Sequence, residues 1–167
     1  NPFGLMFHEV TASNLVKIDI DGNIVDTSEH PVNPAGFVIH SAIHAAREDA
    51  LCVMHSHTSA GMAVAALASG LNRSDFGGIA LAGRVAYHNF EGLTVRIDER
   101  ERLVQSLGDK NHLILRNHGL LTCGGSVAQA MIRLYTLQRA CEVQMLARAS
   151  GEALIEPTPA TCESHAR

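Results

Sequence analysis

The strongest structural signal in the sequence is a helical periodicity near its C-terminal end. Ser126 and Gln129 fit the S-x-x-Q capping box, in which two side chains satisfy backbone amides at the start of a helix. Apolar residues then recur at the three- and four-residue spacing of a helix that buries one face: Val127, Ala130, Met131, Leu134, Leu137, Cys141 and Met145. Gly151, Pro157 and Pro159 end the pattern. We therefore expect a long helix that starts near residue 127 and ends near residue 150.

Short apolar runs between turn signals predict β-strands upstream of this helix. The expected strands cover residues 16–20, 23–25, 51–54, 85–87, 93–97 and 112–116, and Asp21-Gly22 is a hairpin turn between the first two. Further helices are expected at 34–47, 59–69 and 98–107. Asn33 suits the cap of the first of these helices and Pro34 its first position. No linker divides the chain, so we expect one domain over residues 1–167 that lacks further N-terminal helices and the C-terminal end.

Composition narrows the function classes. The chain is 46% hydrophobic and 18% charged, which is typical of a soluble globular protein. Its net charge is −4 and it contains no run of Lys and Arg, so we expect no nucleic-acid partner. Polar residues interrupt every apolar stretch short of a membrane span, so we expect no membrane partner. Four cysteines without a CxxC pair favour a reduced, cytoplasmic setting, with Cys123 and Cys141 in the core.

Two histidines follow directly on one of the apolar runs. His55 and His57 are two positions apart, and on a strand such residues point to the same side. Two imidazoles that project together suit a divalent metal such as zinc. The third candidate ligand is His118, which follows the run at 112–116. The alternative is that these histidines only face water at the ends of their strands.

A second histidine pair lies on a predicted helix. His40 and His44 are four residues apart and share one face, so they could also chelate a metal. A metalloprotease motif requires a glutamate directly after the first histidine, and His40 is followed by Ser41 instead. We interpret the pair as packing groups, or as groups that orient a ligand histidine through a ring nitrogen. Gly124 and Gly125 could bind an anion at the start of the last helix, but a strand-to-helix turn is the simpler interpretation.

Four segments together carry a resemblance to a known family. They are VMHSHT at 53–58, LRNHGLL at 115–121, ACE at 140–142 and NPAGF at 33–37. Their order and spacing resemble the class II aldolase/adducin family, most closely its adducin-like bacterial branch. The resemblance extends from about residue 1 to about residue 150.

The resemblance implies an α/β fold, a three-layer α/β/α sandwich around a mixed, largely antiparallel sheet. It also implies a divalent metal held by His55, His57 and His118. Zinc is the usual ion, and iron and manganese are the alternatives. In the sugar-phosphate aldolases of the family, the metal acts as a Lewis acid on the hydroxyl and carbonyl oxygens of the substrate and stabilises an enediolate.

The sequence departs from those aldolases in one short segment. Gly36 stands where the family has its acid/base glutamate, and Pro34 and Ala35 stand where two serines bind phosphate. His40, one turn along the same helix, is the nearest replacement acid/base. Because these changes remove both a proton-transfer group and phosphate contacts, we do not expect efficient cleavage of sugar-phosphate aldols.

Three functions remain open at this point. The first is a metal-dependent lyase that acts by aldol cleavage or decarboxylation on a small hydroxy-carbonyl or carboxylate compound. The second is a non-catalytic, adducin-like binding or assembly module, and the third is a metal-dependent oxygenase on the same fold. The family builds its active sites between subunits, so we also expect a homo-oligomer, possibly a tetramer.

Overall fold

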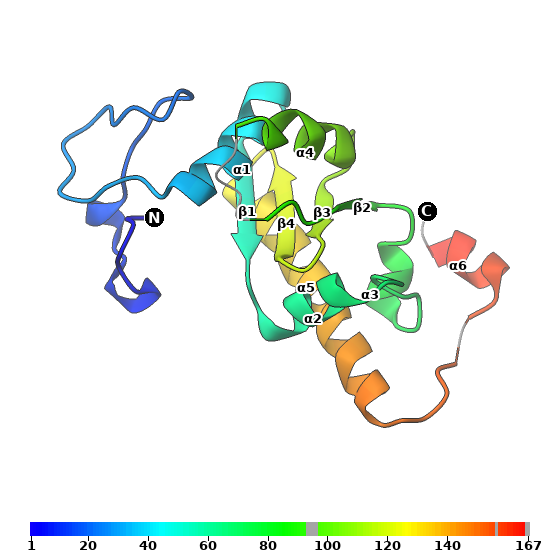
Figure 1. Ribbon diagram of the computed structural model, residues 1–167. Coiled ribbons are helices and arrows are strands. Elements are labelled where there is room, and N and C mark those ends of the chain that lie inside the picture. The colour runs from blue at the N-terminus through cyan, green and yellow to red at the C-terminus, as the bar shows by residue number, and fades with distance from the viewer. Residues whose placement is uncertain (93–96, 156, 166–167) are drawn as a thin grey trace. The chain divides into compact units, whose positions relative to one another are not determined.

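The structure, a computed structural model, describes residues 1–92, 97–155 and 157–165 (Figure 1). The chain forms two compact units. The first contains Asn1–Glu48 and Glu91–Val104, and the second contains Asp49–Phe90 and Gln105–Arg167. Helix α4, Glu99–Leu107, crosses from one unit into the other along the sequence. The single domain over residues 1–167 stays a prediction.

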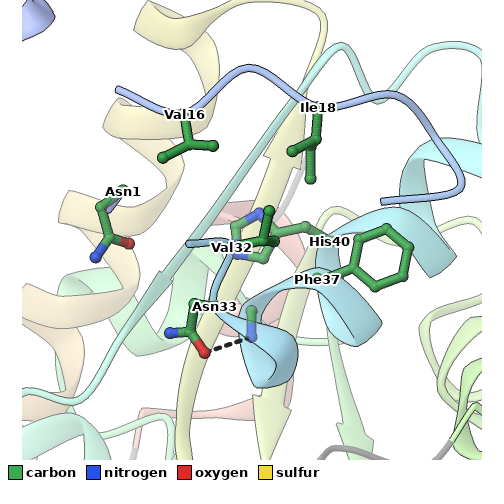
Figure 2. A pocket seen from close by; sticks show the side chains of 8 residues that line it. Asn1, Val16, Ile18, Val32, Asn33, Phe37 and His40 are labelled. Atoms are coloured by element: carbon green, nitrogen blue, oxygen red, sulfur yellow. Dashed lines mark hydrogen bonds between the residues drawn. The ribbon is translucent and has the colours of Figure 1, made fainter. Parts of the chain in front are cut away.

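The first unit is built on helix α1, Pro34–Ala46, which confirms the predicted helix. The side-chain oxygen of Asn33 accepts hydrogen bonds from the backbone amides of Ala35 at 3.2 Å and Gly36 at 3.5 Å (Figure 2). Two short 3₁₀ helices precede α1, η1 at Phe7–Glu9 and η2 at Ala12–Asn14. The buried face of α1 carries Val38, Ile39, Ala42 and Ile43.

The hairpin predicted over residues 16–25 is wrong as a pair of strands. The structure has only an isolated antiparallel bridge between Ile18 and Ile24. The carboxylate of Asp19 accepts hydrogen bonds from the backbone amides of Asp21 at 3.0 Å and Asn23 at 2.9 Å. A side chain that takes up these donors competes with a strand ladder, so the segment forms an Asp-centred turn instead.

The second unit contains a four-stranded sheet in the order β1-β4-β3-β2. Its strands are β1, Cys52–Ser56; β2, Val85–His88; β3, His112–Leu115; and β4, Gly119–Gly124. Strand β4 pairs antiparallel with both β1 and β3, and β2 pairs parallel with β3. This confirms the predicted α/β class with a mixed, largely antiparallel sheet. All residues of β3 and β4 are buried, which explains why both sequences are mostly apolar.

Helix α5, Val127–Ala149, confirms the long helix predicted near the C-terminal end. The hydroxyl of Ser126 accepts from the amide of Gln129 at 3.1 Å, and the Gln129 side chain accepts from the amide of Gly125 at 2.7 Å. The glycine pair before α5 therefore forms the strand-to-helix turn that we favoured. The amide of Gly125 is already paired inside that turn.

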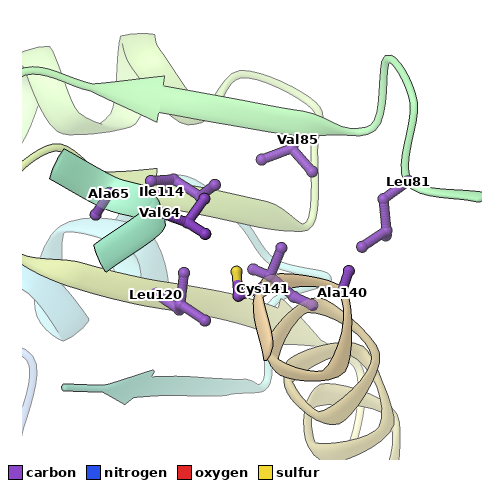
Figure 3. Close-up of a cluster of buried hydrophobic side chains, with 9 residues drawn as sticks. Val64, Ala65, Leu81, Val85, Ile114, Leu120, Ala140 and Cys141 are labelled. Atoms are coloured by element: carbon purple, nitrogen blue, oxygen red, sulfur yellow. The ribbon is translucent and has the colours of Figure 1, made fainter. Parts of the chain in front are cut away.

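Helix α2, Ser59–Ala66, and helix α5 pack on strand β4. Their shared core contains Val64, Ala65, Leu81, Val85, Ile114, Leu120, Leu137, Ala140 and Cys141 (Figure 3). Both Cys123 and Cys141 are buried, as predicted. Gly61 lets α2 approach β4, because a Cβ there would lie 2.8 Å from Cγ of Leu120. Full burial of a Leu side chain is worth about 1.5–3 kcal/mol, so Leu120 contributes to holding α2 on the sheet.

The remaining predictions for local structure had mixed outcomes. Helix α4 and strand β2 confirm the segments predicted at 98–107 and 85–87. The helix predicted at 59–69 ends earlier, at Ala66, and a turn leads to Gly70 at φ +65°. The strand predicted at 93–97 falls mostly on residues 93–96, which lie outside the described residues. The short helices α3, Phe76–Ala80, and α6, Pro159–His165, had no clear sequence signal. Over the described ranges, no helix is long and apolar enough to cross a membrane.

Candidate metal centre

Two of the three predicted ligands come from the end of β1. His55 lies on the strand opposite Leu121 of β4, and His57 follows the last residue of the strand. His55 is half-buried and His57 is exposed. The i, i+2 spacing places both rings on the same side, as the strand pattern predicts.

The third predicted ligand comes from the tight connection between β3 and β4. Asn117 has φ +54°, a left-handed conformation that Asn tolerates better than most residues. The amide of Asn117 donates to the carbonyl of Ala65 at 3.2 Å, and the amide of His118 donates to the carbonyl of Leu115 at 3.1 Å. These bonds fix the loop, so His118 is turned toward the end of β1.

The three imidazoles converge. One ligand nitrogen from each of His55, His57 and His118 lies within 4.8 Å of the others. The ring centroids are 4.5 Å apart for His55 and His57, 4.8 Å for His55 and His118, and 4.7 Å for His57 and His118. The structure therefore brings together all three of the predicted metal ligands, from segments about 60 residues apart, which is the arrangement of a three-histidine metal site.

Hydrogen bonding selects the tautomer of His55 that a metal requires. Nδ1 of His55 lies 2.8 Å from the carbonyl oxygen of Leu120, which can only accept, so Nδ1 carries the proton. The lone pair of Nε2 then points toward Nε2 of His57, 2.7 Å away. A carbonyl that orients a ligand histidine through its other nitrogen is the usual support of a metal site.

The charge state also suits a metal. Burial, followed by the nearby His57, lowers the pKa of His118 below its usual value. A lowered pKa keeps this imidazole neutral at pH 7, and neutral imidazole is the form that binds a metal. The donor set therefore fits a divalent ion: three nitrogen atoms, one with a fixed tautomer and one with a reduced affinity for protons.

Gly119 is required for this geometry. A Cβ at this position would lie 2.4 Å from the backbone oxygen of Ser56, and 3.1 and 3.3 Å from the rings of His57 and His55. The backbone of the loop can approach the end of β1 only where residue 119 has no side chain. This contact explains why a glycine directly follows His118.

A side-chain network anchors the segment after His57 to helix α5. The hydroxyl of Thr58 donates to Oε1 of Gln138 at 2.5 Å, and Nε2 of Gln138 donates to Glu142 at 2.8 Å. The bond from Gln138, assisted by Arg139, lowers the pKa of Glu142. Sequence reasoning did not identify Gln138. The feature that could have identified it is that Gln138 is a polar residue on the apolar face of the predicted helix, next to Leu137.

His40, the predicted acid/base, belongs to the first unit. It lines a cavity of about 190 Å³ together with Val16, Ile18 and Phe37, among other residues (Figure 2). Burial, with a smaller contribution from His44, lowers the pKa of His40 to about 4. The ring is therefore neutral at pH 7. His44 is exposed, and it is not among the clustered candidate ligands in the part of the chain that the structure describes.

Gly36 lines the same cavity. A Cβ on Gly36 would meet no atom closer than Cγ of Asn33 at 3.7 Å, which is an ordinary contact. The helix therefore has room for a side chain at the position where the resemblance places a glutamate. Sterics do not explain the glycine.

Comparisons with known proteins identify the family of the chain. The family model described as Class II Aldolase and Adducin N-terminal domain matches residues 1–145. A protein of Pseudomonas aeruginosa named putative aldolase class 2 protein is 50% identical over 155 residues, which cover 93% of this chain and 60% of that protein. Rat alpha-adducin is 47% identical over 153 residues, covering 90% of this chain and 21% of alpha-adducin.

Solved structures show the same fold. An aldolase II superfamily protein from Pseudomonas syringae has a TM-score of 0.94 and 52% identity, covering 99% of this chain and 67% of that chain. An L-fuculose 1-phosphate aldolase from Glaciozyma antarctica has a TM-score of 0.85 and 32% identity, covering 99% of this chain and 64% of that chain. The present chain spans 60–65% of the length of the curated aldolase-type relatives that it matches.

Proposed function

Because the chain belongs to the class II aldolase and adducin family, we propose that it is a divalent-metal-dependent lyase. Its substrate would be a small hydroxy-carbonyl or carboxylate compound, cleaved at a carbon–carbon bond by aldol cleavage or decarboxylation. The observation that carries this proposal is the convergence of His55, His57 and His118 within 4.8 Å. Class II aldolases are generally dependent on a divalent metal, and this triad could hold one.

The residues of the proposed site would have separate roles. His55, His57 and His118 would hold the ion, with zinc as the first choice and iron or manganese as alternatives, since imidazole suits all three. The bound ion would supply Lewis-acid polarisation of the substrate oxygens. The carbonyl of Leu120 keeps the proton of His55 on Nδ1, and the bond from Thr58 to Gln138 holds the segment after His57.

We assign proton transfer to His40. Its low pKa, about 4, leaves the ring neutral at pH 7, so it would serve as a weak general base and not as an acid. Decarboxylation needs mainly stabilisation of a carbanion, so the loss of a glutamate at Gly36 harms it less than it harms aldol cleavage. We therefore propose that the metal-loaded protein cleaves fuculose, rhamnulose and ribulose phosphates poorly, although an L-fuculose 1-phosphate aldolase shares its fold.

A non-catalytic role is the second candidate. Alpha-adducin matches this chain with nearly the same identity as the aldolase-type relative, 47% against 50%. In that case the fold would serve as a binding or assembly module. Turnover on a panel of small hydroxy acids and keto acids distinguishes the two, because a module gives none whatever its metal content.

We also propose a homo-oligomer, possibly a tetramer, in the cytoplasm. Val127, Met131 and Tyr135 form an apolar stripe on α5 at four-residue spacing, with exposed fractions of 68%, 51% and 54%. A second copy of the chain would cover such a stripe. The four cysteines are all free, which suits a reducing compartment. Light scattering at micromolar concentration tests the assembly, and a monomeric mass would reject it.

Metal analysis tests the site itself. The purified wild type should contain about one equivalent of divalent metal, and His118→Ala should contain less than about a tenth of that, because two ligands do not make a structural or catalytic site. His8→Ala is the matched control, since His8 is an exposed histidine in the first unit. Equal metal content in the wild type and in His118→Ala would refute the proposal.

A further inference from the structure

A group of charged side chains lies at the opposite end of the sheet from the histidine triad. His112 begins β3 and pairs with Thr122 near the end of β4, whereas His118 follows the end of β3. Thr122 lies three positions after Gly119 on β4, about 10 Å along the strand. Around His112 there is a cavity of about 490 Å³, and every residue that lines it belongs to the second unit.

Three separate segments bring cationic side chains to this cavity. Arg84 precedes β2, Lys110 precedes β3, and Arg133 lies in the second turn of α5. Asp109 is the single acidic residue among the lining residues, so the formal charge of the lining is 3 − 1 = +2. The whole chain carries −4. A positive cavity in an acidic chain is a local concentration of charge of the kind that attracts anions.

Arg133 is held in place before any ligand arrives. One of its N–H groups donates to the carbonyl of Cys123 at 2.6 Å, and the side chain is half-buried. A guanidinium has five N–H donors in a rigid fork, so this single bond fixes the fork and leaves further donors for a ligand. Nζ of Lys110 lies 3.3 Å from the carbonyl of Val85, which fixes the second cation at the wall of the cavity.

His112 is a neutral member of the cavity lining. The imidazole is buried, and its ring is hydrogen-bonded to the backbone of Arg84. Burial, followed by the charges of Arg133 and Arg84, lowers its pKa to about 4. His112 therefore adds no positive charge at pH 7. Burial is the larger cause of this lowered pKa, and the charges of Arg133 and Arg84 add to it.

We propose that this cavity binds a small phosphate-bearing anion, either inorganic phosphate or a phosphomonoester. The lining charge of +2 complements a phosphate dianion, and the fork of Arg133 matches two phosphate oxygens. The volume of about 490 Å³ lies within the range of small-molecule sites. This site is separate from the proposed lyase centre and does not depend on a metal at His55, His57 and His118.

Calorimetric titration with inorganic phosphate at constant ionic strength tests the proposal. Arg133→Met should weaken binding about tenfold or more, since hydrogen bonds between charged groups are the strong ones. Asp109→Asn should tighten binding about threefold, because it removes the one negative charge of the lining. Arg148→Met is the matched control: Arg148 lies on the same helix outside the cavity and should leave the affinity unchanged.

His118→Ala separates this site from the proposed metal centre. The variant should bind phosphate with the affinity of the wild type, whatever its metal content. Loss of phosphate binding in His118→Ala would assign the phosphate to the metal centre and overturn the proposal. Equal affinity in the wild type and Arg133→Met would also overturn it. Should Arg133→Met not fold, Asp109→Asn decides alone, and weaker or unchanged binding there rejects the site.

Discussion

The two units of the chain hold their histidines by different means. In the second unit, His55 and His118 are placed by paired strands and by hydrogen bonds to backbone carbonyls and amides. In the first unit, His40 is carried by one helix and lines a small cavity beside Val16, Ile18 and Phe37. Strand pairing brings several imidazoles to one point, whereas burial on a helix produces one neutral imidazole. The first arrangement is the one we propose for a metal, and the second the one we propose for proton transfer.

The largest effect should come from the sheet that positions the triad. Leu120 is fully buried on β4, so Leu120→Ala should lower the free energy of unfolding by about 2–5 kcal/mol. Leu51→Ala, at a residue with an exposed fraction of 73%, should cost less than about 0.5 kcal/mol. Urea denaturation measures both. Similar costs for the two variants would break the claim that the β4 core supports the site.

Acid should expose the buried histidine of each unit. The pKa of His40 and of His112 is about 4 in the folded chain, against 6.5 for an unperturbed histidine. The folded state therefore binds fewer protons, so stability is full above pH 6.5 and is lost as the pH falls from 6.5 to 4. We expect a loss of roughly 2–3 kcal/mol for each residue.

The variant His40→Leu sharpens this comparison. In this variant, the stability of the first unit should depend less on pH, and the stability of the second unit should depend on pH as in the wild type. NMR of backbone amides in each unit measures both. His8→Gln, at an exposed histidine, should change neither profile. An unchanged slope in His40→Leu would show that the burial of His40 does not set its charge state.

A smaller effect is expected at the loop beside the triad. Gly119→Ala should destabilise the chain by about 1–3 kcal/mol, since its Cβ would press on the backbone of Ser56 and the strands must shift. The same shift should separate the imidazoles and reduce the metal content. Chemical denaturation and metal analysis of one preparation test both consequences. A variant with normal stability and full metal content would contradict the requirement for glycine.

The smallest expected effect is an increase in the stability of the first unit. Gly36 lies inside α1 with room for a Cβ, so Gly36→Ala should raise the free energy of unfolding by about 0.5–1 kcal/mol. Gly119→Ala and Gly36→Ala are the same chemical change with opposite expected signs. Thermal denaturation of the pair would separate a glycine that sterics require from one that they do not. A loss of stability in Gly36→Ala would show that the helix requires glycine at position 36.

Local signals predicted local structure well. Helices α1 and α5 follow from caps and periodicity that lie within their own segments, and the strand before His55 follows from one apolar run. The triad was predictable as three candidates, because each histidine sits at the end of such a run. The convergence itself depends on the pairing of β1 with β4, and the hydrogen bond from His55 to Leu120 joins residues 65 positions apart.

Other features had no local signal. The bond between Thr58 and Gln138 spans 80 positions, so no window of sequence contains both partners. The prediction of paired strands at 16–25 was wrong for the opposite reason. The carboxylate of Asp19 accepts hydrogen bonds from nearby backbone amides, which are then not available for pairing between strands. The cavity beside His112 gathers residues from three segments whose charges look unremarkable when each is read alone.

The position of β1 in the sheet has a mechanical consequence. β1 is the terminal strand of the described sheet, and it carries His55 and leads into His57, while His118 belongs to the neighbouring hairpin. An ion coordinated by all three histidines would cross-link the edge strand β1 to the interior of the sheet. Fraying of β1 would then be coupled to metal release, and slow exchange of the amide hydrogens of β1 would report how firmly the ion is held.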